Sequence, residues 1–138
     1  MCSKDNLAVL CSLIEELSST ADGALFLYSI DSSPYTVFAP SDGGLSAFLK
    51  NVDTKDMDVV RNLLLFHMTD TKLLSEDLVC DQELAMLNGE TTMTQCNKNK
   101  RRFQVGQGNS QNELPKITEA DIYSCRGIIH VLKYVIKQ

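Results

Sequence analysis

The longest apolar run in the chain is its last full segment, residues 127–136. Five of these ten residues are β-branched, and Gly127 breaks the chain at the start of the run. Isoleucine and valine lose rotamer freedom in a helix, so this composition favours a strand. The apolar positions also fit one face of a helix, so periodicity alone leaves the helical alternative open. As a strand the segment is apolar on both faces, which predicts a place inside the sheet, beside a second strand at residues 35–39.

The first half of the chain is predicted to be mainly helical. The expected helices cover residues 5–18, 22–30, 41–49 and 54–68. Short polar residues that can cap a helix precede three of them. The candidates are Ser3 or Asp5 for the first, Ser41 or Asp42 for the third, and Asp53 or Thr54 for the fourth. In the fourth, Met57, Val60 and Leu64 form an apolar stripe that His67 continues, so we expect this histidine to point into the core.

The second half is predicted to be mostly strand. Strands are expected at residues 84–87, 91–96, 102–105 and 116–123, with a short strand or turn at 73–78 and a loop at 106–115. Asn88-Gly89 between two strand-like stretches is a strong hairpin signal. Helices come first and strands follow, with no linker or internal repeat. This order predicts one α+β domain over residues 1–138.

The hairpin could close in two registers. A two-residue turn would leave the cysteines on either side one position out of register. A three-residue loop over residues 87–89, with Gly89 in the left-handed region as a bulge, places Cys80 directly opposite Cys96. Opposed strand residues have Cβ atoms about 4.5–5.5 Å apart, so we predict this register and a disulfide between the two cysteines. The weak point is the stretch 81–83, whose polar residues are poor strand formers and could bend away.

Five short motifs follow one another along the chain. They are Tyr35-Thr-Val-Phe-Ala-Pro-Ser-Asp42, Leu63-Leu-Leu-Phe-His-Met68, Leu87-Asn-Gly89, Ile117-Thr-Glu-Ala-Asp-Ile122 and Gly127-Ile-Ile-His-Val-Leu132. In this order and spacing they resemble the signatures of the fasciclin domain family, and the resemblance covers essentially the whole chain. It implies a wedge-shaped β-sandwich with several helices packed along one side. The pair Cys80 and Cys96 resembles the variant found in secreted algal members. Three departures are Arg126 for the usual Asn, Phe66 for Tyr, and Gly44-Leu45 for Ala-Phe.

Charge and cysteine content narrow the class of protein. The net charge is −5 and the pI is about 4.9, which argues against nucleic acid as the main partner. Five cysteines without a C-x-x-C pair favour a disulfide-permissive, extracellular setting over a zinc site. The resemblance implies the same, because fasciclin domains are typically secreted or displayed on cell surfaces. No apolar run reaches the length of a membrane span and no signal peptide is present, so we expect a mature region cut from a longer precursor.

Catalytic, metal and cofactor sites are not predicted. The chain has no G-x-S-x-G motif, phosphate loop or calcium loop, and Glu15-Glu16 belongs to a solvated helix face. His67 and His130 are expected to be hydrogen-bonded core residues, because a buried imidazole must find partners. The resemblance implies that His67 lies near Asp42. Asn88 and Gly89 are expected to be structural residues of the hairpin turn.

Two clusters are candidates for binding. Lys98, Lys100, Arg101 and Arg102 hold four of the thirteen cationic residues. They form either a solvated hairpin tip or a contact for a sulfated or acidic polysaccharide. The resemblance implies adhesion candidates at Asp121-Ile122, proposed to face integrins in animal members, and at Phe66 with His67. The structural alternative for Asp121-Ile122 is a cap and a core residue.

These observations predict a non-catalytic extracellular adhesion or matrix-interaction module. Its partner would be a cell-surface or matrix protein or glycan, or a second copy of the domain in homophilic contacts, and not nucleic acid. The alternative is a secreted polysaccharide- or small-ligand-binding module that uses the basic tip at residues 98–102.

Overall fold

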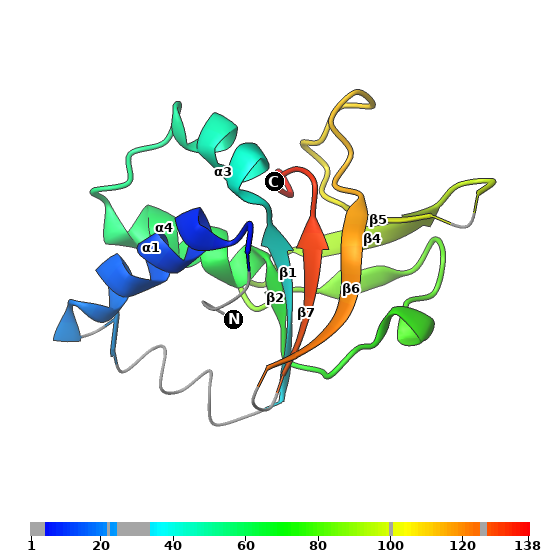
Figure 1. The fold of residues 1–138 in the computed structure, drawn as a ribbon, viewed down its shortest axis with the longest axis horizontal. Coiled ribbons are helices and arrows are strands. Elements are labelled where there is room, and N and C mark those ends of the chain that lie inside the picture. The colour runs from blue at the N-terminus through cyan, green and yellow to red at the C-terminus, as the bar shows by residue number, and fades with distance from the viewer. Residues whose placement is uncertain (1–4, 22, 25–33, 100, 125–126) are drawn as a thin grey trace.

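The computed structural model describes residues 5–21, 23–24, 34–99, 101–124 and 127–138, and shows two β-sheets with helices along one side (Figure 1). The helices are α1 (Ala8–Ser18), α3 (Asp42–Leu49) and α4 (Met57–Phe66), with a 3-10 turn η1 (Ser75–Asp77). The strands are β1 (Tyr35–Pro40), β2 (Met68–Thr69), β3 (Glu83–Ala85), β4 (Thr91–Cys96), β5 (Arg102–Val105), β6 (Ile117–Ser124) and β7 (Gly127–Leu132). The helix predicted over residues 22–30 lies almost wholly outside the described residues. The predicted α+β class is confirmed.

The larger sheet is organised around β7, which lies between β1 and β6 in the order β2-β1-β7-β6. It runs parallel to β1, with His130 opposite Phe38, and antiparallel to β6. The predicted interior strand and its partner are therefore confirmed, and the helical alternative is wrong. The strand ends at Leu132, short of the predicted end at residue 136. It stops there because β1 ends at Pro40, the partner of Leu132, and the later residues lose their parallel neighbour.

Two separate hydrophobic cores lie on the two faces of this sheet. The core on the helical face includes Leu10, Leu13, Leu17, Val37, Ala39, Val60, Leu64, Ile129 and Val131. The core on the other face comprises Phe38, Phe66, Leu78, Met86, Leu132 and Ile136. Side chains alternate along a strand, so β1 and β7 each supply both cores. Burial on both faces explains why β7 is a continuous apolar run in the sequence.

Helix α1 is capped by a residue distant in the sequence. Its N-cap residue Leu7 offers no side-chain hydrogen bond, and Asp42 Oδ1 instead accepts the N–H of Val9 at 2.8 Å. The prediction of Asp5 as the cap is therefore wrong, and Ser3 lies outside the described residues. The reason is tertiary: α1 packs beside α3, so the carboxylate that opens α3 reaches the free N–H groups of α1.

The other helices carry local caps. Ser41 is the N-cap of α3, as predicted, and its Oγ accepts a backbone N–H of the first turn. Helix α4 is capped by Asp56, so the predicted caps Asp53 and Thr54 are wrong by two or more positions. This helix also ends earlier than predicted, with His67 as its C-cap, because the chain turns there to pair β2 with β1.

The β3–β4 hairpin has the predicted register, with Ala85 opposite Thr91. Gly89 has a φ of +91°, and its N–H donates to the Met86 carbonyl oxygen at 3.0 Å. Met86 in turn donates its N–H to the carbonyl oxygen of Glu90 at 2.8 Å. The loop therefore contains three residues with a left-handed glycine, and the two-residue alternative is wrong.

The predicted disulfide joins Cys80 to Cys96, whose Cα atoms are 5.6 Å apart. The polar stretch before β3 does bend, since β3 begins only at Glu83 and Asp81 has a φ of +66°. The Asp81 N–H still donates to the carbonyl oxygen of Thr94 at 2.6 Å. The bend is thus absorbed within the hairpin, and the cysteines remain opposed.

Candidate interaction surface

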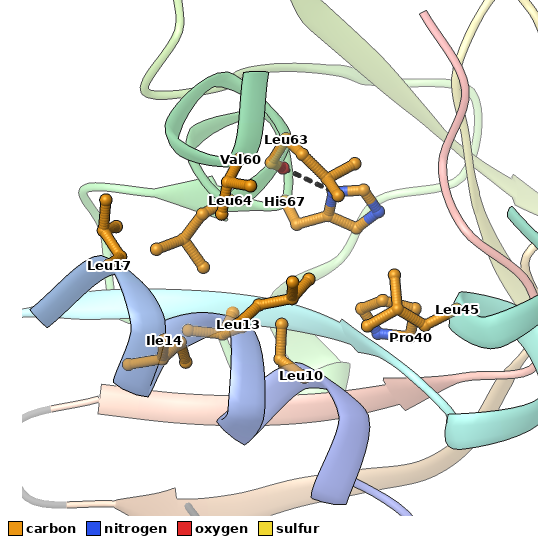
Figure 2. Close-up of a pocket in the computed structure, with 11 residues that line it drawn as sticks. Leu10, Leu13, Ile14, Leu17, Pro40, Leu45, Val60, Leu63, Leu64 and His67 are labelled. Atoms are coloured by element: carbon orange, nitrogen blue, oxygen red, sulfur yellow. Dashed lines mark hydrogen bonds between the residues drawn. The ribbon is translucent and has the colours of Figure 1, made fainter. Parts of the chain in front are cut away.

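His67 ties α4 to the C-terminal segment. The side chain is 2% exposed, and its Nδ1 lies 2.8 Å from the Leu63 carbonyl oxygen (Figure 2). Its Nε2 accepts the N–H of Ile136 at 3.0 Å. A proton on Nδ1 and a lone pair on Nε2 satisfy both contacts, so the ring is neutral. Burial lowers the pKa of His67 to about 4, and the hydrogen bond to Leu63 only partly opposes this effect.

The partner expected for His67, Asp42, is engaged elsewhere. Both ring nitrogens of His67 are used by backbone groups, and the Asp42 carboxylate accepts the N–H of Val9 in α1. This division follows from their positions, because Asp42 opens α3 towards α1, whereas His67 closes α4 beside residue 136. With both nitrogens occupied, this histidine has no position left for a metal or a substrate.

His130 joins three segments of the fold. The residue is fully buried in β7, its Nδ1 accepts the Asp121 N–H at 3.2 Å, and its Nε2 lies 2.8 Å from the Leu73 carbonyl oxygen. These contacts require a neutral ring with its proton on Nε2. Burial lowers the pKa of His130, against smaller opposing effects of Leu73 and Asp121. Its contacts support a structural role in joining β6, β7 and the segment before η1.

Asp121 anchors η1 to β6. Its carboxylate accepts both the N–H and the Oγ–H of Ser75, each at 2.6 Å, and its own φ is +61°. Partial desolvation raises the pKa of Asp121, but the Ser75 hydrogen bonds and the nearby His130 and Arg102 outweigh it, and the net pKa is lowered. The carboxylate considered for adhesion is therefore already used within the domain.

Substituting Asp121 with alanine is expected to lower the free energy of unfolding by about 1–2 kcal/mol. Alanine is strained at the left-handed backbone conformation of residue 121. It also leaves the N–H and Oγ–H of Ser75 without their charged acceptor. Asp121→Asn is the matched control and should lose less, because asparagine tolerates this backbone region and keeps one acceptor. Urea unfolding monitored by circular dichroism measures both. A midpoint unchanged in Asp121→Ala would show that the carboxylate is not anchored in solution and is available to a partner.

The four adhesion candidates do not share one surface. Phe66 and His67 are each 2% exposed and belong to the interior. Ile122 is half-buried against the core on the helical face, opposite Ile129 in the sheet. Among the four, only Asp121 is exposed, and Ser75 occupies its carboxylate. A contact surface made from these residues would need the interior ones to move.

An apolar cavity lies between α1, α4 and the end of β1 (Figure 2). It is lined by Leu10, Leu13, Ile14, Leu17, Val37, Pro40, Leu45, Val60, Leu63, Leu64 and His67. Its volume of about 10 Å³ is close to the smallest space that holds one water molecule. The imidazole in its wall is already hydrogen-bonded, so the cavity is a packing defect and not a ligand pocket.

A larger hollow of about 800 Å³ lies between α3 and the C-terminal segment. Phe48 and Val52 form part of its apolar lining, and the polar side includes Lys137, which pairs with Glu113 at 3.1 Å. This hollow is open to solvent. Its described lining residues do not include two titratable side chains placed as an acid and a base for catalysis.

The basic cluster is divided by the fold. Lys98 and Arg101 are exposed at the turn between β4 and β5, whereas Lys100 lies outside the described residues. Arg102 is half-buried on β5 opposite Cys96, close enough to Asp121 to affect its pKa. The single cluster of the sequence thus becomes an exposed tip and an inward-facing arginine.

Among the described residues, the exposed large apolar side chains are Val59, Val79 and Tyr123. Tyr123 is 68% exposed with the Lys72 ammonium 5.4 Å from its ring centre, and Val79 is 58% exposed.

In the described part of the chain, no three His, Cys, Asp or Glu side chains gather to hold a metal ion. No helix there has the length and apolar character needed to cross a membrane.

Sequence reasoning missed two residues that shape these surfaces. Ser75 meets Asp121 across 46 positions, and nothing in its local sequence signals that contact. Asn97 accepts the N–H groups of Asn99 and Arg101 with its Oδ1, both at 3.0 Å, and so holds these two residues of the turn. An asparagine at the start of a hairpin turn was the available signal for the second.

Comparison with known proteins gives one family and one fold. The family model of the fasciclin domain matches residues 11–138. A solved structure of a FAS1 domain pair from the insect cell adhesion molecule fasciclin I is similar, with a TM-score of 0.68 and 17% identity. The match covers 89% of this chain and 43% of that one, so this chain spans less than half of the domain pair. No curated protein sequence matches the chain.

Proposed function

The chain belongs to the fasciclin domain family. We propose that residues 1–138 form a single extracellular, non-catalytic module for adhesion or matrix interaction. Fasciclin domains are generally non-catalytic, are found outside the cell or on its surface, and are commonly linked to cell adhesion. The observation that carries the proposal is the family match over nearly the whole chain. The Cys80–Cys96 disulfide supports the extracellular setting, since such bonds persist in oxidising compartments.

The chemistry of the interior also favours recognition over catalysis. Both histidines are buried, neutral and hydrogen-bonded to the backbone, with their pKa values lowered by burial. A general base must be within reach of its substrate, and neither ring has a free nitrogen at a surface hollow. Recognition would instead use exposed patches on the rigid sheets, with affinity from apolar and polar contacts over an area rather than from a deep pocket.

Attachment of cells to the immobilised domain tests this function. Beads coated with native domain should retain cells of the source organism, whereas beads coated with reduced, denatured domain at the same density should not. Mixing coated beads without cells separately tests homophilic contacts. Absence of attachment and of bead aggregation would contradict the proposal. So would turnover of an ester, peptide or glycoside that disappears on a single substitution at His67, His130 or Ser41.

A further inference from the structure

The β4–β5 hairpin is an acid-free region of an acidic protein. The chain has a net charge of −5, yet residues 91–112 contain no Asp or Glu and include four of its thirteen Lys and Arg residues. Figure 1 shows the small sheet, with this hairpin, projecting on the side away from the helices. A local positive field on an acidic molecule attracts polyanions to one place and repels them elsewhere.

We propose that the outward face of the β4–β5 hairpin and its basic tip bind a linear anionic polysaccharide that carries sulfate or uronate groups. The inference rests on the proposed extracellular recognition function and names the class of partner. The ligand runs along the hairpin, with its charged groups at the tip and its sugar rings on the strands.

Asn97 is hydrogen-bonded to two residues of the turn, Asn99 and Arg101, before any ligand binds. Asn97 Oδ1 accepts the N–H groups of Asn99 and Arg101, and the Asn97 N–H donates to the Arg101 carbonyl oxygen at 3.1 Å. These three bonds close the turn that carries Lys98 and Arg101. Backbone that is already hydrogen-bonded loses less conformational entropy on binding, so the cation of Arg101 can contribute to affinity.

The inner face of the small sheet holds the hairpin rigid. Thr94 Oγ1 donates to Gln104 Oε1 at 2.7 Å, and Gln104 Nε2 donates to Thr92 Oγ1 at 2.7 Å. All three side chains are at most 2% exposed, so this network is shielded from competing water. The disulfide at Cys96 fixes the tip end of β4 to the chain before β3.

The outward face carries aromatic, apolar and amide side chains, which can contact sugar rings and their hydroxyl groups. Because Gln104 points inward, its neighbours Phe103 and Val105 on β5 point outward, and Arg101 is exposed in the turn just before the strand. Phe103 lies opposite Gln95, and Val105 lies opposite Met93. A shallow hollow of about 230 Å³ lies along this face, lined in part by Met93, Gln95 and Val105. Glu83 of β3 also lines it, opposite Met93, so the sugar rings rather than the charged groups of the ligand lie at this end.

An anionic polysaccharide matches both the exposed cations of the tip and the outward side chains of β4 and β5. The half-exposed ring of Phe103 offers a surface to the apolar face of a sugar, and Gln95 can exchange hydrogen bonds with hydroxyl groups. Lys98 and Arg101 face the sulfate or carboxylate groups, and binding releases the counterions that a polyanion condenses. Arg102 does not take part, because it lies on the inner side near Asp121.

Binding of defined oligosaccharides tests the proposal. The probes are a heparin-derived oligosaccharide, an oligogalacturonate and neutral dextran, titrated by calorimetry at low salt. The variant Lys98→Gln/Arg101→Gln should weaken binding of the favoured anionic probe about tenfold or more. The matched control Lys50→Gln/Lys55→Gln removes the same charge from two exposed lysines on the helical side and should bind as the native domain does. The two anionic probes separate sulfate from uronate recognition.

A second variant isolates the contact with the sugar ring. Phe103→Leu should weaken binding without changing the salt dependence of Kd, because it removes an uncharged surface, whereas the double variant at the tip should flatten that dependence. Circular dichroism confirms that each variant is folded before titration.

Absence of binding to both anionic probes would overturn the proposal. Equal losses of binding in the tip variant and in its control would also overturn it. Cell attachment that persists after enzymatic removal of surface glycans would leave the adhesion function standing and reject the polysaccharide. Failure of attachment with intact oligosaccharide binding would do the reverse.

Discussion

Lowering the pH from 7 to 5 is expected to reduce the free energy of unfolding by about 2 kcal/mol through His67 alone. Burial lowers the pKa of His67 from 6.5 to about 4 in the folded domain. Between these two values the unfolded chain takes up a proton that the folded domain does not. Stability is therefore fully present above pH 6.5 and is lost as the pH falls towards 4. His130, whose pKa is also lowered by burial, acts in the same direction.

The variant His67→Ala separates this effect from other titrations. At pH 7 it should lose roughly 1–3 kcal/mol, because Leu63 and Ile136 lose their partner and the core loses packing. Its stability should depend less on pH, so that native and variant domains converge as the pH falls. Guanidinium unfolding at several pH values between 5 and 7 measures both dependences. This range lies above the pKa values of most carboxyl groups, so their titration contributes little. Parallel curves for the two proteins would show that His67 is accessible and protonates freely in the folded state.

Removing the Cys80–Cys96 bond with Cys80→Ser/Cys96→Ser is expected to cost about 3 kcal/mol of unfolding free energy. The bond closes a loop with a sequence separation of 16, and in the chain-entropy model its main effect is to restrict the unfolded chain. The variant should therefore also show a steeper dependence on denaturant, because its unfolded state is less compact.

Substitution is needed because chemical reduction would not isolate this bond. Cys11 is also disulfide-bonded, so a reductant would act on more than one link. Peptide mapping without reduction should recover Cys80 joined to Cys96 in the native domain. A free Cys80, or a double variant as stable as the native domain, would contradict the contribution assigned to the bond. The single variant Cys80→Ser breaks the same bond but keeps Cys96, so its comparison with the double variant isolates the effect of serine at position 96.

The site was less predictable than the fold. The basic residues 98–102 form one group in the sequence, but strand alternation turns Arg102 inward while Arg101 stays on the exposed face. Asp121 and Ile122 are adjacent in the sequence, yet one is held by Ser75 and the other packs on the core. Neighbouring residues in a strand face opposite sides, and the partner of each is set by segments far along the chain.

Local sequence signals were sufficient to predict the interior strand β7, its partner β1 and the register of the β3–β4 hairpin. Each depends on local signals: β-branched apolar runs, a glycine that can take a positive φ, and the period of two along a strand. The long-range partners of buried and capping polar groups depend on the tertiary structure. Asp42 caps α1 across 33 positions, and His67 accepts the N–H of residue 136 across 69. A buried polar group must be satisfied by whatever lies beside it, and local sequence does not encode which distant backbone that will be.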